Sequence, residues 1–232
     1  MVGSALLREL HDRVAPVTLA AEQLLAVPEP LQPLFTQGGM PRGISVGFQG
    51  PGSWSIALAL AGVALGSDGW MAVVGVEELG LVAAAELGVR LDRMLLIASM
   101  GAANLAPVVA ALVEAMDVIV VAPRSPVGVR DARRLQARAR ERGTVLFHLD
   151  GGAHWPEALD LTIKADNDRW EGIGWGHGHL WLRHLDVQAV GRRAASRERR
   201  VSVVVGGPDG SVLAPARALS PNRELRTTEA LS

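Results

Sequence analysis

The residues with the most chemical content follow an apolar run at residues 44–48. Their spacing is that of the phosphate-binding pattern G-x-x-x-x-G-K-[ST], in which backbone amides hold phosphates, a lysine reaches the outer phosphates and a hydroxyl holds magnesium. The stretch reads Gly50, Pro51, Gly52, Ser53, Trp54, Ser55, Ile56 and Ala57. A magnesium-triphosphate would face the isoleucine side chain of Ile56 and the indole of Trp54 in place of the lysine. We therefore expect no ATP hydrolysis, no catalytic residue and no bound cofactor.

The same stretch also has a purely structural interpretation. Glycine-proline-glycine after an apolar strand is a common turn, because glycine supplies a positive φ and proline fixes its own φ. The motif is therefore a degenerate phosphate loop or an ordinary turn between a strand and a helix. The rest of the chain has to decide between the two.

Arginine is concentrated in a predicted helix at residues 129–142 and in a link at residues 192–200. A basic stripe can bind phosphates and make binding dependent on salt, whereas a run of charge is equally typical of a solvated helix face. The candidate contacts to DNA or to a partner protein are Arg130, Arg133, Arg134, Arg138, Arg192, Arg193, Arg197, Arg199 and Arg200.

Two other groups of residues are weaker candidates for a site. His177 and His179 would share one face of a strand, but a stable zinc site needs three or four ligands, so we expect no metal. Ser53, His148 and Asp150 could form a hydrolase triad, yet the G-x-S-x-G context of a nucleophilic serine is missing and His148 falls inside a predicted strand.

Composition narrows the class of protein. The chain has 232 residues, 49% of them hydrophobic, and a formal net charge of −1, so it can fill a sizeable core and has no global field that attracts nucleic acid or an anionic membrane. Cysteine is absent, which excludes disulfides, thiolate catalysis and cysteine-ligated metals. The start mixes acids and bases, and the longest apolar run, residues 56–65, is too short to span a bilayer. We expect a cytoplasmic protein without membrane contact.

Alternating strands and helices must position these residues. Short apolar runs at 44–48, 70–76, 93–98, 118–121 and 144–149 alternate with helical segments at 79–87, 103–115 and 129–142. Buried parallel strands joined by helical crossovers have this pattern. We expect an α/β fold with three layers and a mostly parallel central sheet.

The two ends of the chain have different patterns. Residues 1–37 predict an amphipathic helical arm, with a second helical stretch around residues 18–27, through which copies of the chain could associate. After residue 152, strands predicted at 158–165, 169–173 and 178–187 indicate an antiparallel extension of the sheet. Residues 191–232 predict an arginine-rich link, a β-hairpin and a tail that is disordered unless bound.

The order of these elements resembles the core of the RecA recombinase family. The residues that carry the resemblance are GGMPRG at 38–43, GPGSW at 50–54, VVGVEELGLVAAAELGVRLDRMLL at 73–96, VIVVA at 118–122 and TVLFHLDGG at 144–152. The resemblance implies a RecA-like α/β/α core over residues 38–190.

The chain departs from that family at the residues that carry the chemistry. The lysine position is Ile56, the hydroxyl position is Ala57, the Walker B aspartate position is Ala122 and the nucleotide-sensing glutamine position is most nearly Gly151. Each loss removes a separate requirement of phosphoryl transfer.

Two further departures concern a glutamate and the DNA-binding loops. Glu77 or Glu78 matches the water-activating glutamate of the family, but without metal or triphosphate we expect an acid at a helix N-terminus, stabilised by the helix dipole. The segments that match the DNA-binding loops, at residues 123–128 and 151–157, are short. We expect no DNA pairing and at most weak or indirect DNA contact.

A RecA-like fold without ATP and DNA chemistry resembles the ImuA class, including its shortened actinobacterial form, and more distantly the SulA division inhibitors. The ImuA resemblance implies a protein-binding adaptor in the SOS response to DNA damage. Such an adaptor acts in translesion synthesis and mutagenesis, and it bridges an ImuB-like Y-family polymerase homologue and an error-prone DnaE-type polymerase. The alternatives are a SulA-like inhibitor of cell division and a weak nucleotide-binding regulator.

Overall fold

A nine-stranded mixed sheet organises the computed structural model, which describes residues 24–98, 102–123, 126–149, 154–173, 178–192, 197–206 and 211–215. Its strand order is β11-β10-β9-β8-β3-β7-β6-β4-β5. The strands are β3 (Ser45–Gln49), β4 (Met71–Val74), β5 (Met94–Ile97), β6 (Val118–Val121), β7 (Val145–His148), β8 (Leu161–Ile173), β9 (Gly178–Gly191), β10 (Arg199–Gly206) and β11 (Val212–Leu213).

Six neighbouring strands, from β8 through β3 to β5, run parallel, and β9, β10 and β11 continue the sheet in antiparallel pairing. The strands β4, β6 and β7 are buried along their whole length, as expected of parallel strands covered on both faces. The predicted α/β fold with a mostly parallel central sheet is confirmed.

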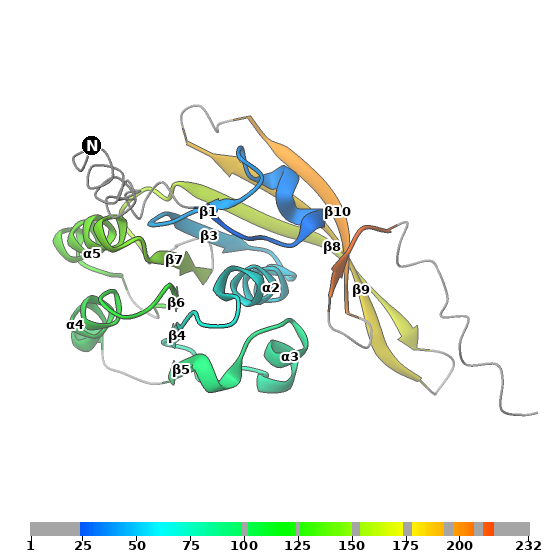
Figure 1. Cartoon of the computed structure of the whole chain (residues 1–232), viewed down its shortest axis with the longest axis horizontal. Coiled ribbons are helices and arrows are strands. Elements are labelled where there is room, and N and C mark those ends of the chain that lie inside the picture. Colours follow the sequence, from blue (N-terminus) through cyan, green and yellow to red (C-terminus); the bar gives the residue numbers. More distant parts are fainter. Residues whose placement is uncertain are drawn as a thin grey trace, which may run out of the picture.

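Helices cover both faces of the parallel strands (Figure 1). They are α2 (Ser53–Leu65), α3 (Leu81–Glu86), α4 (Ala102–Leu112) and α5 (Val129–Arg142). The helices α2 and α3 lie on one face of the sheet, and α4 and α5 lie on the other. Successive residues of one strand point to opposite faces, so Val73 packs in the core with α2 and Val74 packs in the core with α4. The architecture has three layers, as the sequence pattern predicts.

The helices differ in how far they are buried. Seven residues of α2 are buried, and Gly62 lets this helix approach the backbone of Leu87 behind α3, since a Cβ at residue 62 would lie 2.5 Å from the Leu87 carbonyl oxygen. α5 is strongly amphipathic, with Ala132, Leu135 and Ala139 in the core and the arginines outside. It ends at Gly143, which adopts the left-handed conformation with φ of 73° that favours glycine.

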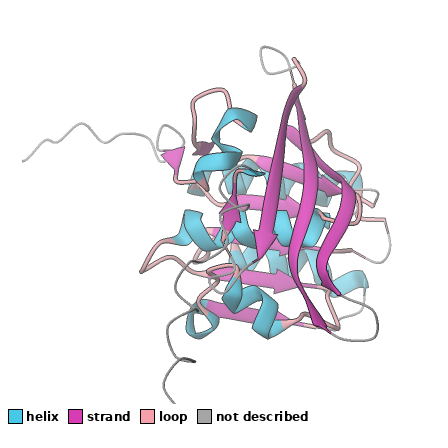
Figure 2. Cartoon of the chain, turned by 90° about the vertical axis from the view of Figure 1, so that its right-hand side faces the viewer, coloured by secondary structure: helices cyan, strands magenta, loops and turns pink. Residues whose placement is uncertain are grey.

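The extension beyond the parallel strands differs from its prediction. The strands expected at 158–165 and 169–173 form one strand, β8, whose ladder to β9 is interrupted between Asp166 and Arg169 and between Glu171 and Ile173. Irregular pairing of this kind bends and twists a strand pair without ending it. Figure 2 shows these long strands curving across one end of the molecule. The sheet also continues past residue 190, where the sequence pattern places the end of the core, because β10 pairs with β9 from Arg199 to Gly206.

The helical stretch predicted around residues 18–27 is wrong at its end. Leu24–Leu25 form a short strand, β1, which pairs with β2 (Met40–Pro41). Pairing with β2 satisfies backbone hydrogen-bonding groups of these two residues in an extended conformation. Two short 3-10 helices complete the described elements, η2 (Glu29–Leu34) and η3 (Leu91–Arg93). The rest of the predicted N-terminal arm and the predicted C-terminal tail lie outside the described residues.

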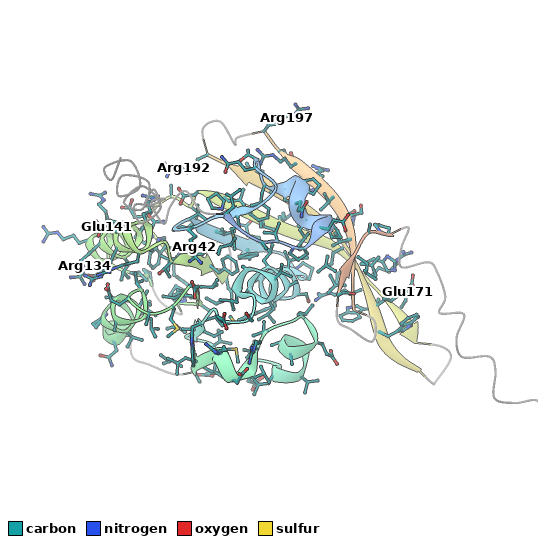
Figure 3. The ribbon with its side chains drawn as sticks, viewed as in Figure 1. Arg42, Arg134, Glu141, Glu171, Arg192 and Arg197 are labelled. Atoms are coloured by element: carbon teal, nitrogen blue, oxygen red, sulfur yellow. The ribbon has the colours of Figure 1, made fainter. Side chains whose placement is uncertain are left out.

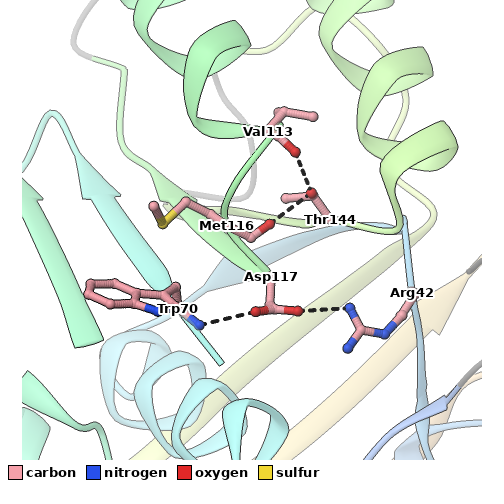
Figure 4. A network of polar contacts seen from close by, with 6 residues as sticks. All are labelled: Arg42, Trp70, Val113, Met116, Asp117 and Thr144. Atoms are coloured by element: carbon pink, nitrogen blue, oxygen red, sulfur yellow. Dashed lines mark hydrogen bonds and ion pairs between the residues drawn. The ribbon is translucent and has the colours of Figure 1, made fainter. Parts of the chain in front are cut away.

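A polar network ties together the amino-terminal ends of the parallel strands (Figure 4). The Asp117 carboxylate accepts hydrogen bonds from the Arg42 guanidinium at 2.9 Å and from the Trp70 amide at 3.1 Å. The Thr144 hydroxyl lies 2.8 Å from the Met116 carbonyl oxygen. The network belongs to the fold, because it lies at the end of the sheet opposite the glycine turn. Within the described residues, no helix is both long and apolar enough to cross a membrane.

Candidate functional site

The glycine turn lies where β3 ends and α2 begins. From β3 the chain crosses to β4 on one side, whereas β8 pairs with β3 on the other side. In open α/β sheets, ligands bind at such a switch point, outside the carboxyl ends of the strands. Gly50 adopts a φ of 87°, and Gly52 is the N-cap residue of α2, where it offers no side chain to cap the helix. The turn therefore has the position of a ligand-binding loop.

The amides of this turn, however, are bonded to the protein itself. The Gly52 N–H donates to the Ala165 carbonyl oxygen at 3.2 Å, and the Ser53 N–H donates to the Gly50 carbonyl oxygen at 3.1 Å. A Cβ at residue 52 would lie 2.6 Å from a methyl carbon of Leu185 and 3.0 Å from the Ala165 Cβ, so the glycine permits close packing against β8 and β9. Two amides that could cradle a phosphate are thus already satisfied.

Arg183 of β9 holds the turn from the other side. Its guanidinium donates to the Pro51 carbonyl oxygen at 2.7 Å and to the Ser55 hydroxyl at 2.8 Å. The same group forms a bidentate pair with Asp168 at 2.7 and 2.6 Å, and it lies 5.0 Å from the centre of the Trp170 ring. Arg183 therefore locks the turn to the β8–β9 pair.

The pKa of Asp168 reports the same contact. The hydrogen bonds from the Arg183 guanidinium hold the pKa of this carboxyl below its ordinary value, against a smaller opposing effect of burial. Neither Arg183 nor Asp168 was predicted as a site residue. The sequence signal is weak, because Arg183 falls in the predicted strand 178–187 while Asp168 falls just before the predicted strand 169–173.

The positions that carry phosphate chemistry in the motif face the core or a cleft. The side chains of Ile56 and Ala57 are fully buried in the core between α2 and the sheet. Trp54 is half-buried and packs against the same core. Ala122, at the Walker B position, is half-buried at the end of β6. A lysine at position 56 would have to leave this core to reach a phosphate.

A cleft of about 480 Å³ opens at the carboxyl ends of β3, β4, β6 and β7. It is lined by Ser53, Trp54, Gly75, Val76, Glu77, Glu78, Ala122, Pro123, Leu149 and His154. The prediction that a glutamate caps the following helix is wrong, because α3 begins at Leu81 and has no acid in its first turn. Both glutamates line the cleft instead, and their charge opposes a triphosphate there.

His148 packs inside the sheet and away from Ser53. It ends β7, is fully buried and lies 4.5 Å from the centre of the Trp155 ring, and neither ring nitrogen has a hydrogen-bond partner. Burial lowers the pKa of His148 to about 3. The imidazole packs in the core on the α4–α5 face, whereas Ser53 opens α2 and lines the cleft, so the two do not form a nucleophile and base. Asp150 lies outside the described residues.

Acids from other elements balance much of the arginine helix. Arg138 and Arg142 both pair with Glu114 of the α4–β6 connection. Arg133 pairs with Glu157 at 3.2 Å and Arg140 with Asp160 at 3.1 Å. Arg134 pairs with Asp131 at 3.3 Å, while Arg130 is exposed. Figure 3 shows Arg134 and Glu141 at the outer surface of α5. The sequence indicated only the acids on the helix itself, and the tertiary structure adds Glu114, Glu157 and Asp160.

The arginines of the link are dispersed. Arg199 donates to the Leu34 carbonyl oxygen at 3.2 Å, Arg192 donates to the Ala158 carbonyl oxygen at 3.3 Å, and Arg200 pairs with Glu198. Arg197 is exposed and Arg193 lies outside the described residues. Figure 3 shows Arg192 and Arg197 on the upper edge of the molecule and Arg134 on α5, so the two groups of arginines do not form one continuous stripe.

Metal binding has no support within the described residues. No group of three or more His, Asp or Glu side chains is suitably placed there for a metal ion. His177 and His179 themselves lie outside the side chains that the structure describes.

Comparison with known proteins finds a relative and a family model that match part of this chain. The uncharacterized protein Rv3395c of Mycobacterium tuberculosis is 34% identical over 102 residues, which make up 43% of this chain and 49% of that protein. The match thus spans about half the length of the relative. Residues 33–157, from η2 past the cleft to the segment before β8, match the family model described as MT3502 N-terminal domain, and they make up more than half of the chain. The chain therefore belongs to the MT3502 N-terminal domain family.

Proposed function

We propose that this protein is a non-enzymatic, RecA-like adaptor in DNA-damage-induced mutagenesis, which bridges an ImuB-like Y-family polymerase homologue and an error-prone DnaE-type polymerase. The observation that carries the proposal is the turn between β3 and α2. It occupies the switch point of the sheet, yet its Gly52 and Ser53 amides bond to the chain itself and Arg183 holds its Pro51 carbonyl.

Two further features support a scaffold without phosphoryl transfer. Ile56 and Ala57 are buried in the core, so neither side chain at the lysine and hydroxyl positions of the motif can reach a phosphate. Glu77 and Glu78 line the cleft and oppose an anionic ligand. The biological role rests on the resemblance of a RecA-like chain without ATP and DNA chemistry to the ImuA class.

The test is direct binding between the full chain and the ImuB-like homologue of the same genome. We expect a stable complex in biolayer interferometry, and the same full chain should give no heat signal with millimolar Mg-ATP in calorimetry. A failure to bind the homologue would remove the adaptor function. Micromolar binding of Mg-ATP would instead favour the nucleotide-binding regulator, for which the cleft of about 480 Å³ provides the space.

A further inference from the structure

A two-stranded ribbon at the end of β8 and β9 reaches beyond the strands on either side. β10 stops opposite Leu182 and β3 stops opposite Lys164, so residues 169–173 of β8 have only β9 as a strand partner among the described residues. Figure 1 shows the two strands projecting away from the helical layers, and Figure 3 places Glu171 on this projection, at the opposite end of the molecule from Arg134. As far as the described strands go, the ribbon therefore presents a free strand edge.

Two tryptophans are exposed on this ribbon. Trp170 is 44% exposed and Trp181 is 52% exposed. They lie close along the ladder, because Trp170 pairs with Arg183 and the next pair joins Glu171 to Leu182. Tryptophan and arginine are the residue types that most often dominate binding energy at protein interfaces.

The indole of Trp170 is held in place before any partner arrives. Arg183 stacks over it at 5.0 Å and is itself fixed by Asp168, the Pro51 carbonyl and the Ser55 hydroxyl. A pre-positioned anchor loses less conformational entropy on binding. The turn that resembles a phosphate loop thus supports an interaction surface.

The charges around the indoles are paired within the ribbon. Arg183 pairs with Asp168 at 2.6 Å and Arg169 lies 3.9 Å from Glu171. A charged partner segment would find no opposite charge that is free of such a pair among these four residues. The charge pattern therefore fits an uncharged, apolar segment better than a phosphate backbone, which needs unpaired basic residues.

We infer that residues 169–173 and Trp181 form the docking site for an extended apolar segment of the partner protein, which adds as a strand to the free edge of β8. Main-chain hydrogen bonds to the edge of β8 provide affinity, and large side chains of the segment pack on the two indoles. This inference rests on the proposed adaptor function and names the surface that such an adaptor would use.

The experiment compares binding of the ImuB-like homologue to full-length variants in biolayer interferometry. We expect the Trp170→Ala, Trp181→Ala double variant to bind about 100-fold or more weakly, since truncation of each hot-spot residue costs a tenfold effect or more. Trp70→Ala is the matched control, because Trp70 is 40% exposed and carries a stacked Arg93 at 5.2 Å at the other end of the sheet. This control should change the affinity less than threefold.

Amide hydrogen exchange of the complex tests the strand addition itself. We expect slower exchange at residues 169–173 and no change at β5, the other edge of the parallel strands. Equal binding by wild type and double variant, or protection at β5 in place of β8, would overturn the docking site and leave the adaptor function standing. No binding by the wild type would overturn both. The double variant could instead lose binding to a 20-mer of oligo-dT while it still binds the partner. That result would make the ribbon a nucleic-acid platform and overturn the inference.

Discussion

His148 makes the stability of this protein depend on pH. Its pKa is about 3 in the folded state and 6.5 without burial, so between these values the unfolded chain binds a proton that the folded chain does not. Stability therefore falls as the pH falls from 6.5 toward 3. We expect a loss of about 2 kcal/mol in the free energy of unfolding between pH 7 and pH 5, measured by urea denaturation.

A leucine at position 148 should abolish this contribution. Neither ring nitrogen of His148 has a hydrogen-bond partner, so His148→Leu takes no partner away from another polar group and should not lower stability at pH 7. His154→Gln serves as the control, because it removes a histidine at the cleft without changing the buried site. If His148→Leu and wild type lose the same free energy between pH 7 and pH 5, the buried imidazole is not the cause.

The second single residue with a large expected effect is Arg183. Arg183→Ala leaves Asp168 without its bidentate partner and releases the Pro51 carbonyl and the Ser55 hydroxyl. We expect a loss of about 2–3 kcal/mol in the free energy of unfolding at pH 7, because the pair is only slightly exposed. Arg200→Ala, which breaks an exposed pair with Glu198, should cost less than about 1 kcal/mol. Equal losses in the two variants would mean that Arg183 does not hold the turn.

Helix packing gives a prediction whose sign opposes helix propensity. Gly62 lies within α2, where alanine would ordinarily stabilise the helix by about 1 kcal/mol. A Cβ at this position would lie 2.5 Å from the Leu87 carbonyl oxygen and 2.8 Å from the Gly88 carbonyl carbon, both backbone atoms. Gly62→Ala should therefore lower the melting temperature. Val63→Ala on the exposed side of the same helix should change it little, and a higher melting temperature for Gly62→Ala would show that α3 can move away.

The ion pairs of α5 predict weak DNA binding. Most arginines of this helix already face an acid, so we expect a Kd for duplex DNA no tighter than about 1 µM at physiological salt, measured by fluorescence anisotropy. Glu114→Gln removes the partner of Arg138 and Arg142 and should strengthen DNA binding. Glu86→Gln on α3 is the control that should leave it unchanged. Nanomolar binding of duplex DNA by the wild type would contradict the interpretation that these ion pairs offset the charge of the α5 arginines.

The whole sheet sets where the chain can be shortened. β10 buries Val203, Val204 and Val205, and each buried valine contributes about 1.5–3 kcal/mol. That sum is comparable with the total stability of a domain. A chain that ends at Gly191 should therefore lack cooperative unfolding in circular dichroism. A chain that ends at Pro215 keeps every described strand and should unfold like the full protein; equal unfolding of both truncations would show that β10 is dispensable.

Much of the fold could be predicted because local pattern and tertiary environment agree. The strand Val118–Val121 and the helix Val129–Arg142 have the predicted bounds, since a uniformly apolar run and an amphipathic run with a terminal glycine each have one stable arrangement in a layered sheet. Leu24–Leu25 form a strand against expectation, because a partner some fifteen residues later supplies its hydrogen bonds. Strand pairing at such a distance has no local signal.

The candidate site divides in the same way. The spacing from Gly50 to Ala57 predicts a turn between a strand and a helix, and the structure places one there. The contact between Arg183 and the turn joins residues 128 positions apart and depends on the irregular register of β8 and β9, which no periodicity specifies. The location of Glu77 and Glu78 in the cleft likewise follows from the late start of α3.

The sequence alone established that the lysine and hydroxyl of a phosphate loop are missing and that buried strands alternate with helices. Both statements follow from residue type and local spacing, which the fold cannot alter. Only the tertiary structure decided that Arg183 holds the turn and that acids from other elements pair with most arginines of α5. It also decided that, among the described residues, β8 and β9 project with an unpaired edge. These features depend on strand order and register, through which residues remote in the chain come within hydrogen-bonding distance.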